Sequence, residues 1–130
     1  MADETANKEL VRKVFYDIFV KHDFSAFDKY YVQEGFVQHN PYMGNGVDAI
    51  RELVTGLMEA GSTYELGFIT AAEDIVMIHG RFTGYKAGPV IVTDIYRVKD
   101  GKLAEHWDVI QDEVSAPETK SGNSMFEPGA

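Results

Sequence analysis

The stretch that decides the fold is VTDIYRVKDGKLAEHWDVIQ, residues 92–111. Both halves are rich in β-branched and aromatic residues, and Asp100-Gly101 between them is a strong hairpin signal. In the second strand His106 and Asp108 are two residues apart, so their side chains share one face while Trp107 projects from the other. An imidazole and a carboxylate side by side are candidates for proton transfer, although most such pairs simply face solvent.

The register of this hairpin decides which residues join that face. With a two-residue loop, Ile95 faces His106. With a three-residue loop, in which Gly101 forms a bulge, Asp94 faces His106 instead. We favour the second register, because a glycine suits the left-handed conformation that such a bulge requires. It predicts that Asp94, His106 and Asp108 lie on one surface.

Helical periodicity precedes these strands. Apolar residues recur at three- and four-residue spacing over 5–22 and again over 47–60, which predicts two amphipathic helices. A short helix capped by Ser25 is predicted between them. Beyond the second long helix the period changes, and 64–71 and 75–85 are predicted to be two further strands. Four consecutive strands therefore follow the helices.

Helices followed by a meander of long strands predict an α+β domain. Long strands in so small a sheet must twist and curl, and the helices then cover the concave face. We expect a cone-shaped, curved antiparallel sheet covered by N-terminal helices, with a small-molecule cavity between them. Residues 1–130 are expected to form one domain, in which 112–130 are an irregular, mobile tail. Alternatively, Met125-Phe126 folds back over a pocket or a partner subunit.

The composition argues against several classes of function. With 21 acidic and 12 basic side chains the net charge is −9, so neither nucleic acid nor a membrane surface is an expected partner. There is no cysteine, which excludes disulfides, thiolate nucleophiles and cysteine-ligated zinc. We expect no signal peptide in the polar, acidic start of the chain, and no apolar run reaches the roughly 20 residues of a membrane helix. The expected location is the cytoplasm.

Four motifs carry a family resemblance. They are Gln38-His39-Asn40-Pro41, Asp94-Ile95-Tyr96-Arg97-Val98, Asp100-Gly101-Lys102 and Glu105-His106-Trp107-Asp108. With them the chain resembles the nuclear transport factor 2-like superfamily and, within it, the SnoaL-like polyketide cyclase group. Gln111 and Asn123-Ser124-Met125-Phe126 are also similar to a branch of predicted aldol-condensation enzymes. The resemblance spans about residues 15–126 and supports the fold expected from the helices and strands. It does not specify the function, because this fold hosts many different functions.

The resemblance implies acid/base chemistry without a metal or an organic cofactor. In cyclases of this group an Asp near the end of the sheet moves a proton during an aldol closure, and Asp108 is the matching position. Their partner His does not map onto this chain, since Asp94 stands in the corresponding part of the preceding strand. Aldol cyclisation, isomerisation and dehydration therefore stay open, as does a non-catalytic module that binds a small molecule or dimerises. The resemblance also implies a homodimer.

The predicted catalytic residues are Asp108 and His106. Asp108 would act as a base if burial raises its pKa, and the apolar residues around it are compatible with burial. His106 would orient Asp108 or donate a hydrogen bond to a carbonyl oxygen. The expected ligand is a small molecule that is hydrophobic or contains a carbonyl group. The predicted ligand contacts are His39, His79, Tyr42, Asp94 and Trp107.

Each candidate also has a structural interpretation. Asp108 could be exposed or paired with Arg97, and Trp107 could pack against a helix or a partner subunit. Asn40 is predicted to hold backbone groups in its turn. The histidines and Asp108 could converge on a metal ion, but their spacing matches no metal-binding motif, so no metal site is expected.

Overall fold

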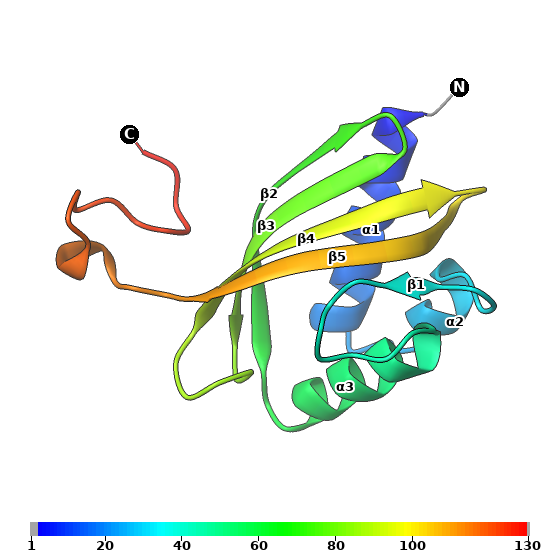
Figure 1. Ribbon diagram of the computed structural model, residues 1–130, viewed down its shortest axis with the longest axis horizontal. Helices are drawn as coiled ribbons and strands as arrows, with labels where there is room; N and C mark the ends of the chain where they lie inside the picture. Colours follow the sequence, from blue (N-terminus) through cyan, green and yellow to red (C-terminus); the bar gives the residue numbers. More distant parts are fainter. Residues whose placement is uncertain (1–2, 130) are drawn as a thin grey trace.

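The computed structural model describes residues 3–129 and contains an α+β fold with N-terminal helices, as predicted (Figure 1). The helices come first and the long strands follow them without interruption. The elements in chain order are α1 (Glu4–Phe19), α2 (Ala26–Tyr30), β1 (Val37–Gln38), α3 (Val47–Glu59), β2 (Thr63–Ala72), β3 (Ile75–Thr83), β4 (Val90–Lys99), β5 (Lys102–Asp112) and the short 3₁₀ helix η1 (Ala116–Glu118).

The two long helices form where the apolar period predicted them. Helix α1 is capped by Asp3, whose carboxylate accepts a hydrogen bond from the backbone N–H of Ala6 at 3.0 Å. Its apolar stripe is buried against the sheet and includes Val11, Val14, Phe15 and Ile18. Ser25 does not cap α2 as predicted, because its hydroxyl donates to Asp23 at 2.5 Å instead.

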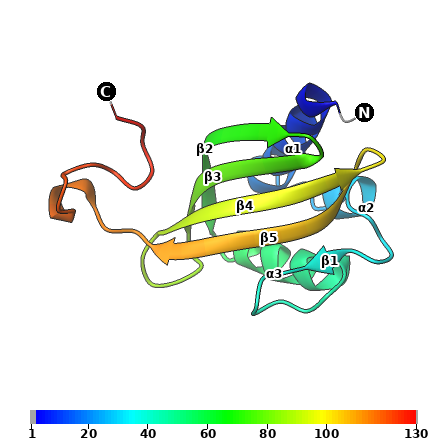
Figure 2. The same ribbon diagram turned by 45° about the horizontal axis from the view of Figure 1, so that its top comes forward.

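The strands form one curved, open sheet in the order β1-β5-β4-β3-β2, and the three helices lie on one side of it (Figure 2). The four long strands are antiparallel, as predicted. Strand β1 was not predicted, and it pairs with β5 in parallel, with Gln38 opposite His106. Two residues are too few to show a sequence period, yet this short strand brings the segment around Asn40 to the edge of β5.

The β4–β5 hairpin corrects both registers considered from the sequence. Its loop has two residues, Asp100 and Gly101, with φ of 51° and 74°, the positive values of a type I′ turn. The favoured three-residue loop is therefore wrong. The two-residue register also holds only as far as Leu103, because a bulge at Ala104 then shifts the pairing by one residue.

This bulge decides which side chains share the concave face. Beyond it Tyr96 pairs with His106, and Asp94 pairs with Asp108. Directly opposed residues in antiparallel strands project from the same face. Asp94 therefore lies beside His106 and Asp108, the outcome that we predicted from the other register.

The C-terminal segment folds back onto the convex face of the sheet. After β5 the side chain of Arg81 forms two hydrogen bonds of 2.7 Å with the carboxylate of Glu113. Further on, the ring of Phe126 lies 4.4 Å from the Arg81 guanidinium carbon and packs against Gly67. A Cβ at Gly67 would stand 2.9 Å from this ring, so the contact needs glycine. Met125-Phe126 thus covers the part of the convex face around Gly67, His79 and Arg81 and leaves the rest of this face open.

The helices of residues 3–129 include none with the length and apolar character to cross a membrane.

Candidate active site

A cavity of about 90 Å³ lies between the helices and the concave face of the sheet. This space is large enough for several water molecules or a small organic group. Most of its wall is apolar and comes from α1, α3 and the inward residues of β3 and β4, such as Phe15, Leu53 and Val92. Its polar wall comes mainly from β4, β5 and the segment after β1, and includes Asn40, Asp94, Tyr96, His106 and Asp108.

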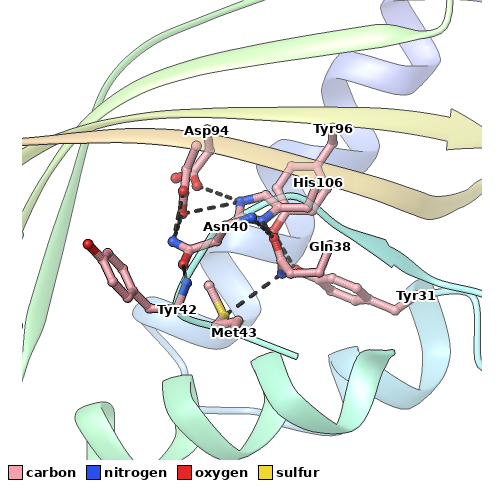
Figure 3. Close-up of polar contacts among 9 residues, drawn as sticks. Tyr31, Gln38, Asn40, Tyr42, Met43, Asp94, Tyr96 and His106 are labelled. Carbon is pink, nitrogen blue, oxygen red and sulfur yellow. Dashed lines mark hydrogen bonds and ion pairs between the residues drawn. The ribbon is translucent and has the colours of Figure 1, made fainter. Parts of the chain in front are cut away.

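His106 is the buried centre of this polar wall, with 2% of its surface exposed. Its Nε2 lies 2.8 Å from Oδ1 of Asp94, and its Nδ1 lies 2.8 Å from Oε1 of Gln38 (Figure 3). The Gln38 oxygen also accepts the backbone N–H of Asn40 at 3.0 Å, which fixes the orientation of the Gln38 amide. Nδ1 of His106 must therefore be the donor towards Gln38.

This arrangement sets the number of protons between His106 and Asp94. Because Nδ1 carries a proton, the contact between Nε2 and the Asp94 carboxyl group holds one further proton, which belongs either to the ring or to the acid. The pair has no net charge in either case. Both ring nitrogens are thus engaged by protein groups, so His106 orients its neighbours and has no free N–H for a ligand.

Asp108 is held by a different donor. Nδ2 of Asn40 lies 2.8 Å and 2.9 Å from the two carboxylate oxygens of Asp108, and Oδ1 of Asn40 accepts the backbone N–H of Tyr42 at 2.8 Å. The Asp108 side chain is only 6% exposed. Nε2 of His106 is 3.9 Å from the nearer Asp108 oxygen, which is beyond hydrogen-bond distance.

The surroundings of Asp108 raise its pKa above the ordinary value of an aspartate. Burial is the main cause, since the ionised form loses contact with water. The nearby charge of Asp94 acts in the same direction, whereas the hydrogen bond from Asn40 and the charge of His106 lower the pKa. A carboxylate with a raised pKa at the wall of an apolar cavity has the properties of a general base.

Four predicted ligand contacts do not line the cavity. His39 and Trp107 stack on the convex face, with ring centroids 4.6 Å apart and planes within 1°, and Nε2 of His39 lies 2.7 Å from Glu105. His79 is also on the convex face, where its Nε2 lies 2.9 Å from the carbonyl oxygen of Met125. The Tyr42 side chain is 86% exposed, although its backbone supports Asn40. We therefore keep only Asp94 from that set in the candidate site.

Sequence reasoning missed Gln38 and Asn40 as parts of the site. Asn40 was predicted to act within its own turn, and it does accept the Tyr42 N–H, but its amide nitrogen also reaches Asp108. The available signal was the alternation of Gln38, His39 and Asn40: in an extended segment the first and third side chains share one side. That pattern carried no weight without a predicted strand at Val37–Gln38.

Asp94, His106 and Asp108 offer three potential metal ligands, whose atoms all lie within 4.8 Å of one another. Their hydrogen bonds fit a cation poorly. The Asn40 amide N–H group points at both oxygens of Asp108, and Nε2 of His106 points at Asp94. A metal ion would have to displace these contacts, so the arrangement is better suited to holding protons.

Comparison with known proteins identifies the family and the fold. Residues 12–106 match the SnoaL-like domain family. No curated protein matches the chain significantly.

Solved structures share the fold at low sequence identity. A proposed hydroxylase, AclR from Streptomyces galilaeus, has a TM-score of 0.70 and 21% identity over 84% of this chain and 91% of its own. A proposed polyketide cyclase from Acidithiobacillus ferrooxidans has a TM-score of 0.67 and 18% identity over 85% and 92%. An LEH-like epoxide hydrolase from M. tuberculosis has a TM-score of 0.65 and 17% identity over 83% and 84%. These neighbours are named for different reactions. The family match covers most of the chain, so the chain belongs to the SnoaL-like domain family.

Proposed function

We propose that this chain is a cofactor-independent enzyme that transfers a proton on a small, carbonyl-containing molecule, with Asp108 as the base. The observation that carries the proposal is the position of Asp108. Its carboxylate lines an apolar cavity, its pKa is raised by burial, and Asn40 holds it in place. The support from the family is general, because related folds carry out different reactions.

The proposed step is the removal of a proton from the carbon next to the carbonyl group. The C–H bond breaks, the proton moves to the Asp108 carboxylate, and the electron pair passes into the carbonyl oxygen to form an enolate. In a β,γ-unsaturated ketone, return of the proton to the γ-carbon gives isomerisation. In a β-hydroxy ketone, the hydroxyl leaves from the β-carbon with this proton, as water, which gives dehydration. Where the enolate attacks a second carbonyl, the proton passes to the alkoxide that forms, which gives an aldol product. All three reactions share this first step, so we assign the step and leave the product open.

Hydrogen–deuterium exchange tests this step without knowledge of the natural substrate. Cyclohexanone and cyclohexane-1,4-dione are incubated with the protein in D₂O, and the loss of their α-proton signals is followed by NMR. We expect exchange above the buffer rate in the presence of the protein. Binding of both ketones with no acceleration of exchange would contradict the proposal and would favour the alternative of a non-catalytic binding module.

We also propose that the chain forms a homodimer through the convex face of the sheet. This face exposes several large apolar side chains, namely Phe68 (56%), Met77 (45%) and Val109 (69%). Exposed large apolar side chains gathered on one face are typical of an interaction surface. We expect light scattering to give twice the mass of one chain, and Val109→Asp to lower this mass towards that of a monomer. A monomeric wild-type protein at the same concentration would contradict this proposal.

A further inference from the structure

Tyr64 presents an unused hydrogen-bond donor in the cavity wall. It lies on β2 and its ring points to the concave face, where it stacks on Phe19 with centroids 4.7 Å apart and meets the edge of Phe15 at 5.3 Å. These contacts hold the ring, which lines the same cavity as Asp108. Buried tyrosine hydroxyls usually have a hydrogen-bond partner.

The Tyr64 hydroxyl has no such partner among residues 3–129, although it is buried. Two other tyrosines of the cavity wall, Tyr31 and Tyr96, differ in this respect, since their hydroxyls bond to each other at 2.9 Å. Burial raises the pKa of Tyr64 above its ordinary value, so its hydroxyl keeps its proton and remains a donor. A donor that is buried and unpaired costs stability, which a ligand oxygen could recover.

The Tyr64 hydroxyl occupies the space that a side chain at Gly80 would fill. The hydroxyl lies directly over Gly80 on β3, and any Cβ at that position would collide with it. Gly80 pairs with Val92 on β4, and the next inward residue of β4 is Asp94, which pairs with Asp108. The hydroxyl is therefore displaced from the carboxylates by two residues along the strands, or roughly 7 Å, and also across the sheet by one strand from Asp94 and two strands from Asp108, at roughly 5 Å a strand.

We propose that Tyr64 is a ligand-binding residue whose hydroxyl donates a hydrogen bond to a second oxygen of the ligand. The first oxygen is the carbonyl whose neighbouring carbon faces Asp108, and this placement rests on the function proposed above. The ligand class is a compact apolar molecule with two acceptor oxygens at opposite ends, as in a 1,4-dione. An apolar ring between the oxygens fits the largely apolar wall of the cavity.

Binding of two matched probes tests this subsite. Dissociation constants for cyclohexane-1,4-dione and cyclohexanone are measured by NMR titration of the wild type, Tyr64→Phe and the control Tyr16→Phe, which removes a hydroxyl from an exposed position of α1. The quantity of interest is the affinity for the dione divided by that for the monoketone. One net hydrogen bond predicts that this ratio falls about fivefold in Tyr64→Phe. In Tyr16→Phe the ratio is expected to equal that of the wild type.

A spectroscopic measurement on the wild type provides a second readout. The chain contains seven tyrosines, and labelling with ¹³Cζ-tyrosine gives one signal for each, with Tyr64 assigned from its Phe variant. Saturation with the dione is expected to shift the Tyr64 signal more than any other. No shift of this signal, no binding of the dione, or an equal probe ratio in all three proteins would overturn the proposal.

The outcomes separate this inference from the proposed reaction. A ratio that falls in Tyr64→Phe, in a protein that does not accelerate deuterium exchange, would support the subsite and reject the reaction. Exchange that depends on Asp108, together with an unchanged ratio in Tyr64→Phe, would support the reaction and reject the subsite.

Discussion

Replacement of Asp108 by Asn is expected to slow the α-proton exchange of bound ketones by about 10²–10⁴-fold, the usual contribution of a positioned general base. The amide has nearly the shape of the carboxylate but cannot accept the proton. The loss should therefore appear in the rate at saturating ketone, with little change in the ketone concentration needed for saturation.

A matched substitution on the same strand separates this effect from a general loss of charge. Asp112 lies at the end of β5, its side chain is 76% exposed, and its contact is a surface ion pair of 3.3 Å with Lys86. Asp112→Asn is expected to exchange at the wild-type rate. Equal losses in the two variants, or no loss in Asp108→Asn, would show that Asp108 is not the base.

The second large effect concerns stability. His106→Leu preserves the approximate volume of the side chain but leaves the buried Asp94 carboxyl group without its His106 donor, while the Gln38 oxygen keeps only the N–H of Asn40. Unsatisfied buried groups cost about 1–3 kcal/mol each, and more when they are charged, so we expect the free energy of unfolding to fall by about 3–5 kcal/mol. Urea unfolding followed by circular dichroism measures this change.

His39→Leu is the matched control for this stability measurement. His39 is the histidine on the opposite face of the same sheet edge, its side chain is 41% exposed, and its hydrogen-bonded pair with Glu105 is at the surface. Such pairs contribute less than about 1 kcal/mol. If both substitutions had the same small effect, the network around His106 would not stabilise the fold in the way described.

The overall fold could be predicted because the sequence patterns that specify its helices and strands extend over many residues and recur along the chain. Helices α1 and α3 carry apolar residues over several turns, and the strands combine β-branched residues with the Asp100-Gly101 turn. The exact register could not be predicted, because the bulge at Ala104 depends on how β5 packs against β4 and leaves no mark in the turn sequence.

The candidate site was predictable where a strand period of two applied. His106 and Asp108 share a face in any register, and the structure places them in the cavity wall. The same period should have excluded His79, since Val76, Ile78 and Phe82 form the buried set of β3 and His79 alternates with them. Apolar residues occupy the concave face in preference to a lone histidine, because burial of their surface stabilises the fold.

The residues that position Asp108 were harder to find. Asn40 comes 68 residues before Asp108, and only the parallel pairing of β1 with β5 brings the two together. A two-residue strand carries almost no signal of its own. Its pairing with β5 is a property of the tertiary structure, and so is the resulting contact between Asn40 and Asp108.

The central claim is that Asp108 is a buried carboxylate whose raised pKa suits it to accept a proton. The rate of exchange should then increase with pH through this pKa, since only the ionised form is a base. The stability of the fold should change with pH in the opposite direction. The folded chain binds the Asp108 proton more tightly than the unfolded chain does. The contribution of Asp108 to stability is therefore present at low pH and is lost as the pH rises through its pKa.

NMR titration of the protein labelled with ¹³Cγ-aspartate tests this claim most directly. We expect Asp108 to titrate above the ordinary value of about 3.9, and to titrate still higher in Asn40→Ala, because Asn40 stabilises the ionised form. An Asp108 signal that titrates at or below this ordinary value would contradict the account.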